Sequence, residues 1–518
     1  MESLPWIVAH WNYVASVTLA YGVALALHRL FFHPLSRFPG PKLAAITRWY
    51  EAYYDVLQNG QYTFKIAEMH KVYGPIIRIS PYELHVSDPA FFDVLYRQDG
   101  RWDKYAWAVD AFTAGGSTIF LADHAIHRAR RQPLSHYFSK GRVASRQEVL
   151  QRHKRKLLVQ ISNFVDRPNA INLGAAVKAF TRDVANEYIL DKDYNSLGQE
   201  EFDAALSPPN SDSGHIWRIT KHVRWFGPFL TKVVPRALVM KTADKGMKSF
   251  FKMITEHEED TVRLMSTPDV VNASGKDHQT VIHAIMASKL PPQDKETGRI
   301  FEDVSTMVGA GTGTTAAALQ LMLVNIFSNP KILERLRAEL DSLDVATSMN
   351  SAVDVESINF PDVKVLEQLP FLTSVLMEGL RLSPAIASRM TRIAPDRELH
   401  YNNWRIPAGT PVGMTTILMH TDETLYPKPH RFDPDRWADL DKRRELEKFW
   451  APFGKGTRNC VGMHLAWAEM YLVVATLVLR YDFRMEAKTE DFLCSSDQFA
   501  IGTKSNGFLK AFVSHHRA

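Results

Sequence analysis

The chain has 518 residues, of which 45% are hydrophobic and 23% are charged, an ordinary composition for a globular protein. Its formal net charge of +5 is too small and too dispersed to indicate a surface that binds nucleic acid. The two cysteines, Cys460 and Cys494, cannot form a disulfide framework, so the fold does not depend on an oxidising compartment.

The N-terminal segment from Leu4 to Leu27 contains no Asp, Glu, Lys or Arg. As a helix that rises about 1.5 Å per residue it would be about 36 Å long, enough to cross a hydrocarbon core of about 30 Å. Basic residues follow at Arg29, Arg37 and Lys42, and only Glu2 precedes the segment. This distribution of charge predicts a membrane anchor over residues 1–30, with the rest of the chain on the cytosolic side.

A cleaved signal peptide is the alternative for this segment, because Ala24-Leu25-Ala26 resembles a cleavage site. Such a peptide needs a basic region before its apolar stretch, and the residues before Leu4 include no Lys or Arg. Next in the chain, Phe38–Lys42 reads FPGPK, and its two prolines favour an extended backbone. We therefore expect a proline-rich linker over residues 31–42 and a catalytic body over residues 43–518.

The body contains segments of both strand and helix character. Ile76–Asp88 alternates apolar and polar residues and is rich in β-branched side chains, which predicts a strand pair. From about residue 148 to residue 340 the pattern is mostly helical, and Asn329-Pro330 marks a helix start within it. Further helices are expected at 369–384 and 461–479, strands at 392–419 with a turn at 407–409, and turn-rich chain at 420–437. The sequence thus predicts a mainly α fold with a smaller β part.

Cys460 stands at the expected start of the 461–479 helix, close to Arg458 and Lys455. The helix terminus and the basic neighbours would lower the pKa of the thiol by about one unit at most, whereas a bound metal ion would deprotonate it outright. Three other roles are open for a lone cysteine. They are a buried structural thiol, half of a zinc site with His464, and a nucleophile with a distant histidine partner.

The residues around Cys460 narrow these choices. The spacing Phe453-x-x-Gly456-x-Arg458-x-Cys460-x-Gly462 resembles the haem-binding loop of the cytochrome P450 family. The resemblance implies that the Cys460 thiolate is the axial ligand of the iron in haem b. It also implies that Gly456 and Gly462 let the backbone approach the porphyrin and donate N–H groups toward the sulfur. In the same loop, Arg458 would pair with a haem propionate and Phe453 would pack beside the ring.

A second match to the family is the pair Glu378 and Arg381, which at spacing i, i+3 share one helix face. As an exposed pair it would contribute well under about 1 kcal/mol. The resemblance implies instead a buried structural triad, completed by an arginine upstream of the cysteine, and Arg431 is the residue expected there. Losing one member would leave a buried charge unpaired, at a cost of about 3–5 kcal/mol.

The third match is Met307–Leu323, where three glycines within a helix cost about 1 kcal/mol each. Close packing against another helix would explain them. The resemblance implies instead the central helix on the distal side of haem, where Ala310 and Gly311 make room for O2 and substrate and Thr314 bonds the dioxygen. Gly313 departs from the family, which usually has Asp or Glu there to relay protons. We expect water with Thr314, or a group on the substrate, to carry the proton.

The fourth match is Asp123–Ser139. Here His127 takes the place of the family's usual tryptophan, and Arg131 that of the arginine that meets the second propionate. Without the resemblance, Arg128, Arg130 and Arg131 are an ordinary solvated basic face. With it, a basic face would attract an acidic electron donor, and further basic residues are expected to join it, namely Lys140, Lys442, Arg443 and Arg444.

Length alone would favour about three domains, but the resemblance implies a single P450 body. It further implies a monooxygenase that inserts one oxygen atom of O2 into a lipophilic molecule, using NADPH electrons from NADPH–cytochrome P450 reductase. Cytochrome b5 is a second candidate donor, and an endoplasmic reticulum membrane protein with a cytosolic body is expected. A haem-thiolate enzyme of rearrangement, desaturation or dehydration is the alternative, and a non-catalytic haem carrier is a further one.

The sequences of two stretches, His33–Ala45 and His420–Trp437, resemble those of P450 enzymes of filamentous-fungal natural-product pathways. This resemblance favours a terpenoid or polyketide-type substrate. Substrate contacts are expected by analogy from residues 101–120 and 205–240, Ala310, Ile386-Ala387 and the turn near Ile501. A set of aromatic and basic residues is expected either at the membrane interface or on a half-buried helix; it comprises Trp217, Trp225 and Phe226 with Lys221 and Arg224.

Overall fold

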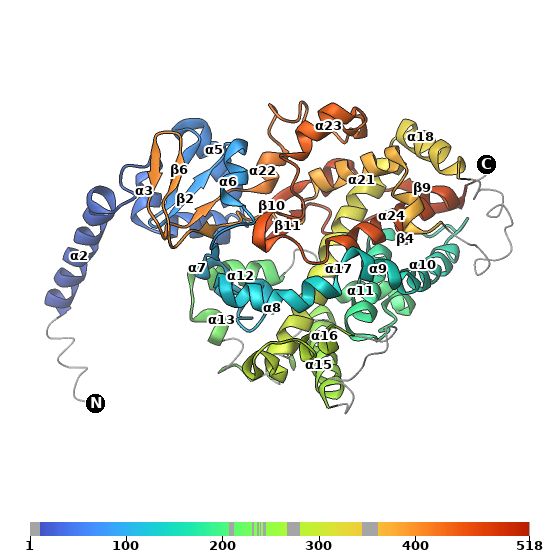
Figure 1. The fold of residues 1–518 in the computed structure, drawn as a ribbon, viewed down its shortest axis with the longest axis horizontal. Helices are drawn as coiled ribbons and strands as arrows, with labels where there is room; N and C mark the ends of the chain where they lie inside the picture. The colour runs from blue at the N-terminus through green and yellow to red at the C-terminus, as the bar shows by residue number, and fades with distance from the viewer. Residues whose placement is uncertain are drawn as a thin grey trace.

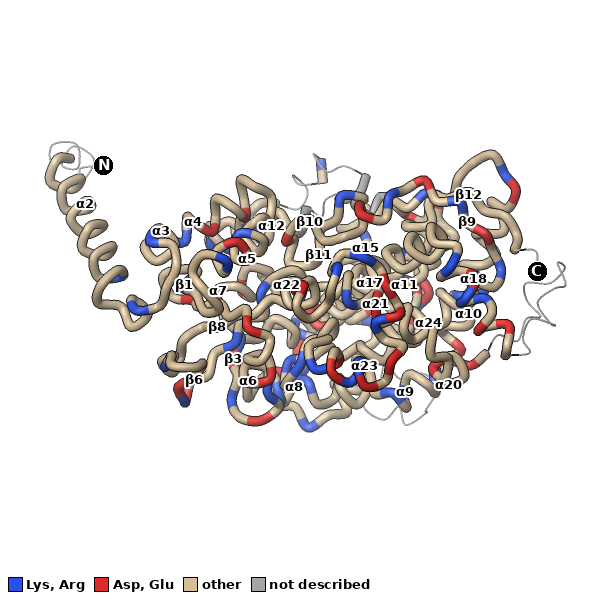
Figure 2. Tube along the Cα trace, turned by 90° about the horizontal axis from the view of Figure 1, so that it is seen from above, with Lys and Arg blue, Asp and Glu red and all other residues tan. Residues whose placement is uncertain are grey.

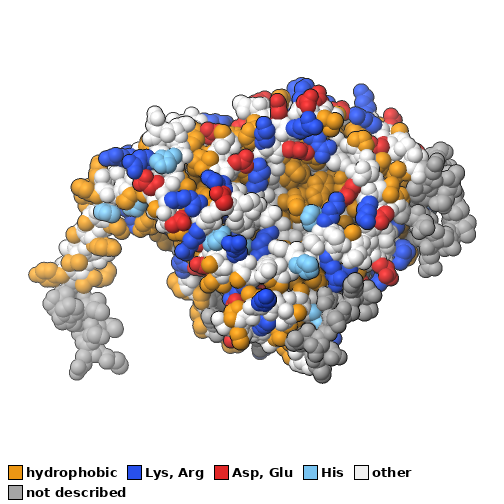
Figure 3. Space-filling view, viewed as in Figure 1, with side chains coloured by type: hydrophobic (Ala, Val, Ile, Leu, Met, Phe, Trp, Pro, Cys, Tyr) orange, Lys and Arg blue, Asp and Glu red, His pale blue; other side chains and the backbone are white. Residues whose placement is uncertain are grey.

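The computed structural model describes residues 11–206, 212–229, 245–266, 280–343 and 361–516, with a few positions between 233 and 241. It begins with α2 (Trp11–Leu27), which continues through a π-helical turn, η1 (His28–Phe32). This helix projects away from the body and is covered with hydrophobic side chains (Figures 1 and 3). No residue of α2 is buried, and Trp11–Phe32 is long and apolar enough to cross a membrane. The predicted anchor helix is therefore present in the part of the segment that the structure describes.

The segment predicted as a linker is fixed to the body. Leu35 and Phe38 are buried in the same hydrophobic cluster as the sheet residues Ile76 and Leu84. The amide of Arg78 donates to the carbonyl of Pro39 at 2.7 Å. A Cβ atom at Gly40 would collide with the carbonyl oxygen of Arg78, so only glycine permits this close approach. The prolines thus direct the chain onto the edge of the sheet.

The β part lies near the N-terminal helix and is built around a five-stranded sheet in the order β1-β2-β8-β5-β3 (Figure 1). The predicted strand pair is confirmed, because β1 (Ile76–Ser80) and β2 (Glu83–Val86) form an antiparallel hairpin. The other strands of the sheet are β3 (Asp103–Lys104), β5 (Arg392–Ile393) and β8 (Val412–Gly413), and a separate hairpin joins β6 (Leu399–Tyr401) to β7 (Trp404–Ile406). The prediction of strands as far as Met419 was wrong at its end, where Thr416–His420 forms the helix α22.

The helical part is organised around α17 (Thr297–Phe327), which runs through the body (Figure 1). The helices that pack against it include α11 (Leu173–Leu190), α15 (Lys245–Met265), α21 (Pro370–Leu382) and α24 (Met463–Arg480). By length and composition α17 and α24 could also cross a membrane, but both lie largely inside the body. Their apolar character is explained by burial on most sides. The predicted helices at 369–384 and 461–479 are confirmed as α21 and α24.

The remaining elements complete the two parts. The helix predicted after Asn329 is α18 (Pro330–Asp341), with Pro330 in its first turn. Other helices include α4 (Trp49–Ala52), α5 (Tyr62–Tyr73), α8 (His124–Tyr137), α10 (Gln147–Ser162), α12 (Asp212–His222), α16 (Val281–Met286) and α23 (Leu440–Glu447). A three-stranded sheet has the order β4 (Ile171–Asn172), β12 (Lys510–His515) and β9 (Tyr481–Met485), and β10 (Cys494–Gln498) pairs with β11 (Ala500–Thr503). The β10–β11 hairpin turns at Phe499, which has a left-handed φ of 70°.

Candidate active site

Cys460 lies in the loop between a 3-10 turn (Gly456–Arg458) and the first turn of α24. Its amide donates to the carbonyl of Phe453 at 2.8 Å, which closes the loop. Gly456 has φ of +73°, and a Cβ atom there would lie 2.7 Å from the carbonyl oxygens of Tyr96 and Arg97. Glycine is therefore required at this position both for its backbone conformation and for the close approach. The Cys460 side chain is exposed at the surface of the loop.

The expectation that position alone lowers the pKa of Cys460 was wrong. Desolvation by the surrounding protein raises the pKa of the thiol, and the Gly462 amide and Arg131 offset only part of that rise. Among the described residues, the clusters that could ligate a metal ion include neither Cys460 nor His464, so the half-zinc-site alternative gains no support. A thiolate at Cys460 requires a bound metal ion or another strong positive charge.

Arg458 and Arg131, the two predicted propionate partners, lie beside the loop. The Arg458 guanidinium donates to the carbonyls of Leu121 and Ala122, both at 2.8 Å, while its Nε is buried without a partner. Arg131 donates to the backbone and side-chain oxygens of Asn459 at 2.6 and 2.7 Å. Burial lowers the pKa of Arg458 to about 9. Both guanidiniums thus fix the loop and retain capacity to bind an anion.

Two further cations of the site, Lys104 and Arg392, were missed by the sequence analysis. They stand opposite each other in the paired strands β3 and β5, although like charges in that position destabilise a sheet. Burial, with Arg392, Arg458 and Arg131 nearby, holds the pKa of Lys104 well below its ordinary value. No local motif joins Lys104 to Arg392, because the strand pairing alone brings them together.

His127, predicted in the place of a tryptophan, is buried on α8 against this cation cluster. Burial and the positive charges of Arg458 and Lys104 lower its pKa to about 2, so the ring is neutral. The nearest acids, Asp103 and Asp123, both pair with Arg101, at 3.1 and 3.3 Å. We call the cluster of Lys104, Arg131, Arg392 and Arg458 the basic cradle. Arg392 and Arg458 are buried and the other two are half-buried, so the cradle has an excess of poorly solvated positive charge suited to carboxylates.

On α17, the predicted distal residues Ala310, Gly311, Gly313 and Thr314 fall on neighbouring faces of one helix. Thr314 Oγ1 donates to the carbonyl of Ala310 at 2.7 Å, the back-bonding common for threonine in helices. A Cβ atom at Gly311 would touch Ala185 at 3.4 Å, whereas at Gly313 it would meet open space. The contact with Ala185 is an ordinary van der Waals distance, so helix packing does not by itself require glycine at Gly311, and it does not explain Gly313.

The predicted ion pair of Glu378 and Arg381 is present on α21, and both side chains are 0% exposed. Arg381 binds the carboxylate through two nitrogens, each at 2.8 Å, and also donates to the carbonyl of His420 at 2.6 Å. Such a bidentate pair ties α21 to the chain that leads toward the cysteine loop.

The prediction that Arg431 is the third member of this triad was wrong. Its side chain is 65% exposed and lies 3.9 Å from Asp433, and only its backbone carbonyl reaches Arg381. The third arginine is Arg436, whose Nε lies 3.3 Å from Glu378 Oε1. A 3-10 turn, η10 (Pro434–Trp437), aims both Arg436 and the Trp437 Nε1–H at the same carboxylate, and Arg431 precedes that turn on the outside of the chain.

Aromatic rings from three of the predicted substrate-contact regions meet in one cluster. Phe112 stacks on Phe120 with ring centroids 4.1 Å apart, and Trp217 of α12 lies 5.6 Å from Phe112. Phe499, at the turn of the β10–β11 hairpin, packs edge-on against Phe112 at 4.6 Å and Trp217 at 5.5 Å. We call these four residues the aromatic cluster. The remainder of the predicted region 205–240 lies partly outside the described residues.

The aromatic and basic residues expected at a membrane interface or on a half-buried helix differ in exposure. Trp225 is 67% exposed, and Arg224 is an exposed residue paired with Asp110 at 2.9 Å. Lys221 is buried, however, and its ammonium contacts both Glu51, at 2.9 Å, and Asp55. Of the two expected alternatives, Lys221 fits the half-buried helix and not the membrane interface, because two buried carboxylates hold it inside.

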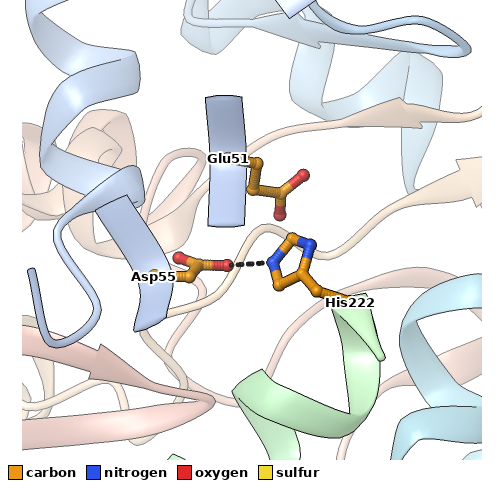
Figure 4. Close-up of side chains that lie close together, drawn as sticks. All are labelled: Glu51, Asp55 and His222. Carbon is orange, nitrogen blue, oxygen red and sulfur yellow. Dashed lines mark hydrogen bonds and ion pairs between the residues drawn. The ribbon is translucent and has the colours of Figure 1, made fainter. Parts of the chain in front are cut away.

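Glu51 and Asp55 form with His222 a group whose spacing would suit a metal ion (Figure 4). His222 Nε2 lies 3.3 Å from Asp55, and Arg389 binds Glu51 at 2.8 Å. Lys221 already lies between the two carboxylates, so a cationic side chain takes the position that an ion would need. A second such group, His153, Glu187 and Asp193, is likewise neutralised by Arg152 and Lys156. We interpret both as salt-bridge networks.

Comparison with known proteins agrees with this geometry. The family model for Cytochrome P450 matches residues 48–509. Cytochrome P450 monooxygenase tpcC of Cochliobolus heterostrophus is 37% identical over 473 residues, covering 90% of this chain and 87% of that protein. Tryptophan 6-hydroxylase fscE of Fusarium equiseti is 36% identical (89% and 88% covered), and N-acetyltryptophan 6-hydroxylase ivoC of Emericella nidulans is 34% identical (94% of each).

Among solved structures, cyanobacterial CYP120A1 with retinoic acid bound matches with a TM-score of 0.67 at 18% identity, covering 89% of this chain and 96% of that one. Fold and cysteine loop together define a haem-thiolate protein. The chain belongs to the cytochrome P450 family, and it is a monooxygenase similar to fungal enzymes of secondary metabolism.

The residues present fit haem b, the cofactor of the family. The basic cradle offers buried donors for the two propionates, including the unpartnered Nε of Arg458. Cys460 is exposed just before the N-terminus of α24, and a Cβ atom at Gly313 on α17 would have no atom within 4 Å. Iron ligation, anchoring of the carboxylates and room for substrate thus each have residues of suitable chemistry.

Proposed function

We propose that this protein inserts one oxygen atom of O2 into a flat, lipophilic small molecule, with haem b ligated by Cys460 and NADPH electrons delivered by a membrane reductase. The observation that carries the proposal is the exposed Cys460 thiol next to a basic cradle whose nearest acids, Asp103 and Asp123, both pair with Arg101. A thiolate ligand with two anchored propionates is the arrangement that this donor set serves best.

Each residue of the site has a distinct task in this proposal. When bound, haem supplies the activation of O2, which no side chain can perform. Arg458, Arg131, Lys104 and Arg392 hold the propionates and so fix the position of the cofactor. Phe453, whose ring lies 6.1 Å from Trp467, shields the cysteine side from water. Thr314 can turn its hydroxyl from the Ala310 carbonyl toward the distal side, where it would donate a hydrogen bond.

The aromatic cluster supports a planar substrate. Its rings come from two 3-10 turns, η4 (Asp110–Phe112) and η5 (Thr118–Phe120), from α12 and from the β10–β11 hairpin. Stacking between flat rings favours aromatic partners. Two relatives are named for hydroxylation of tryptophan and of N-acetyltryptophan, both of which carry an indole ring. We therefore favour an indole or an aromatic polyketide-type molecule over a saturated terpenoid.

The electron donor would bind the face around α8. Basic segments gather there in Figure 2, and Lys140 and Arg444 on neighbouring helices are 64% and 76% exposed. An acidic partner would be attracted to this face by electrostatic steering. NADPH–cytochrome P450 reductase fits this role, with cytochrome b5 as a second donor. The anchor helix supports a location on the endoplasmic reticulum membrane, with the body in the cytosol.

Gly313 supports a second candidate function. Without an acid at this position, a haem-thiolate enzyme that rearranges or dehydrates an already oxidised substrate would need no delivery of protons to O2, because such a reaction consumes no O2. Desaturation would still consume O2, NADPH electrons and protons, as oxygen insertion does. Turnover without NADPH would favour this alternative over the monooxygenase proposal.

The first test is spectroscopic. Purified protein supplied with haem, reduced and exposed to carbon monoxide should show the red-shifted Soret band of a thiolate-ligated haem. Cys460→Ala should abolish that band, while Cys494→Ala should keep it, because Cys494 lies in β10 away from the loop. A band that persists in Cys460→Ala would overturn the proposal. Indoles and aromatic polyketides are then screened for spectral shifts and for NADPH-dependent hydroxylated product.

A further inference from the structure

A cavity of about 160 Å³ lies against α17 on the side of Gly313. Its wall is shared by α17, the start of α11, the β10–β11 hairpin and the chain before β12. Among its lining residues are Lys178, Gly313, Ala317, Gln320, Gln498 and Thr503. The volume is enough for several water molecules, and the amide and hydroxyl groups of the wall give those waters partners.

Lys178 of α11 is the one cationic side chain in this wall. Lys178 is half-buried, and among the described residues its ammonium has neither a hydrogen-bond nor an ion-pair partner, so it is free to bond water in the cavity. The acids nearby are already engaged. Asp203 pairs with Arg182 at 3.4 Å, and Asp183 accepts from the backbone amides of Ser196 and Leu197 at 2.8 and 2.9 Å.

The cavity reaches α17 at the position where this chain departs from its family. A Cβ atom at Gly313 would meet nothing within 4 Å, so no side chain separates the cavity from the backbone there. Gly313 precedes Thr314, and Ala317 lies one helical turn beyond it on the same side. The cavity thus reaches the backbone of α17 beside Gly313, one residue before Thr314, which does not itself line the cavity.

α11 is fastened to α17 at this level. Thr181 Oγ1 donates to the carbonyl of Thr312 at 2.9 Å. Thr181 lies one turn after Lys178 on α11, and Thr312 is the residue before Gly313 on α17. A Cβ atom at Gly311 would lie 3.4 Å from Ala185, so the two helices are also in close contact one turn away. The position of Lys178 relative to Gly313 is therefore set by the packing of two rigid helices.

We propose that Lys178 and the water of this cavity deliver protons past Gly313 to Thr314, in place of the carboxylate that the family usually carries at residue 313. This inference rests on the proposed monooxygenase function. The ammonium of Lys178 gives a proton to a cavity water, and that water passes a proton on toward Thr314. The amine then takes a proton from a second water connected to solvent, so Lys178 is unchanged after each cycle. Lys178 acts through water and Thr314 and is a positioning residue.

The acidity of Lys178 is suited to this role. Burial and the nearby Arg182 lower the pKa of Lys178 to about 8, so it can both hold and release a proton near neutral pH. From the other elements around it, α17 and the β10–β11 hairpin contribute only neutral groups to the cavity wall, such as Gln320, Gln498 and Thr503. We expect the relay to work below about pH 8 and to fail as pH rises through that value.

The experiment compares the holoenzyme with Lys178→Met, Lys178→Arg and the control Lys331→Met, which removes an exposed lysine of α18. Product formed per NADPH oxidised and hydrogen peroxide released are measured on both sides of pH 8. In the unchanged enzyme we expect product per NADPH to fall through about pH 8. Lys178→Met should lower it about tenfold below that pH and remove the pH step. Lys178→Arg should keep the fold but also lack the step.

Two further measurements separate a relay from a structural role. Competitive acetylation of the holoenzyme, read by mass spectrometry, should give Lys178 a pKa near 8, and Gly313→Asp should raise that pKa because the new carboxylate pairs with it. Gly313→Asp in the Lys178→Met background should recover product per NADPH several-fold, because the acid replaces the lysine.

The inference is overturned if Lys178→Met keeps the coupling and pH profile of the unchanged enzyme, or if Gly313→Asp brings no recovery in Lys178→Met. Its failure can be told from failure of the proposed function. If only the relay through Lys178 is wrong, the carbon monoxide spectrum and the product are normal in all variants. If the proposed function is wrong, the unchanged enzyme itself lacks the thiolate spectrum or forms no product.

Discussion

The basic cradle concentrates positive charge that the apoprotein alone does not neutralise. Lys104 and Arg392 are opposed across two strands, and Arg458 and Arg131 lie near enough to lower the pKa of Lys104 further. Each of these side chains is therefore strained electrostatically until an anion binds. At the scale of single residues, the site favours a bound carboxylate at a cost to the stability of the folded chain.

The first prediction concerns the pH dependence of the apoprotein. Lys104 has a lower pKa in the folded apoprotein than in the unfolded chain, so the unfolded chain binds more protons between the two values. The free energy of unfolding should consequently rise as pH increases toward about 10.4, the pKa of an unperturbed lysine. Denaturant titrations at several pH values would measure this rise, and Lys104→Met should flatten it. An equal slope in the variant would contradict the assignment.

The second prediction distinguishes the two candidate arginines of the triad. Arg436→Leu leaves the buried Glu378 short of a partner and should lower the free energy of unfolding by about 3 kcal/mol, with loss of bound haem. Arg431→Leu removes an exposed side chain and should change it by less than about 0.5 kcal/mol. Denaturant unfolding and the carbon monoxide spectrum are the measurements, and similar losses in both variants would argue against the correction.

At the scale of elements, α12 is joined to the β part by charge and to the distal side by aromatic contacts. Lys221 and His222 at its end meet Glu51 and Asp55 from the N-terminal helices (Figure 4). Trp217, one turn earlier, belongs to the aromatic cluster. The positive charges of Arg389 and Lys221 lower the pKa of Glu51 despite its burial, so the network is ionised. Movement of α12 would have to break buried ion pairs.

The third prediction tests this connection. Lys221→Met should leave two buried carboxylates without their shared cation, lower the free energy of unfolding by about 3–5 kcal/mol and speed amide hydrogen exchange in α12. Arg224→Met is the matched control, because its pair with Asp110 is half exposed on both sides and contributes less than about 1 kcal/mol. Unchanged exchange in Lys221→Met would show that α12 is held by other contacts.

Local pattern was enough to predict α18, α21, α24, the β1–β2 hairpin and the glycine-rich cysteine loop, because each depends on residues close together in the chain. The pattern failed where distant segments decide. Strand pairing alone places Lys104 opposite Arg392, and helix packing alone places Lys178 and Gly313 on the same cavity. Arg436 was missed in favour of Arg431 because the 3-10 turn that selects between them has no periodic signal.

At the scale of the whole molecule, the anchor and the body are connected through a docked segment. Leu35 and Phe38 are 2% and 7% exposed, and Arg78 donates to the carbonyl of Arg29 at 2.8 Å. The residues between the anchor helix and α3 (Lys42–Ile46) thus belong to the core of the β part. Folding of the body and placement of the anchor depend on the same contacts.

The fourth prediction compares two truncated chains. A chain that begins at His28 lacks α2 but keeps Leu35, Phe38 and Arg29, and it should bind haem with the thermal stability of the full protein. A chain that begins at Lys42 loses two buried side chains that contribute about 1.5–3 kcal/mol each, and it should unfold at a lower temperature. Thermal scans of the two holoproteins would measure the difference. Equal stability would mean that the docked segment adds nothing.

The docking of Pro39-Gly40 on β1 has a geometric result for an anchored enzyme. A body joined to its membrane helix by a flexible linker would rotate freely relative to the membrane surface and expose each of its sides to the lipid headgroups. Here the chain after the candidate anchor helix docks on the sheet at Pro39-Gly40, so with α2 in a bilayer the orientation of the body relative to the membrane plane would be restricted. A lipophile that diffuses within the leaflet would then approach the same flank of the protein on each encounter, and its capture would become a search in two dimensions.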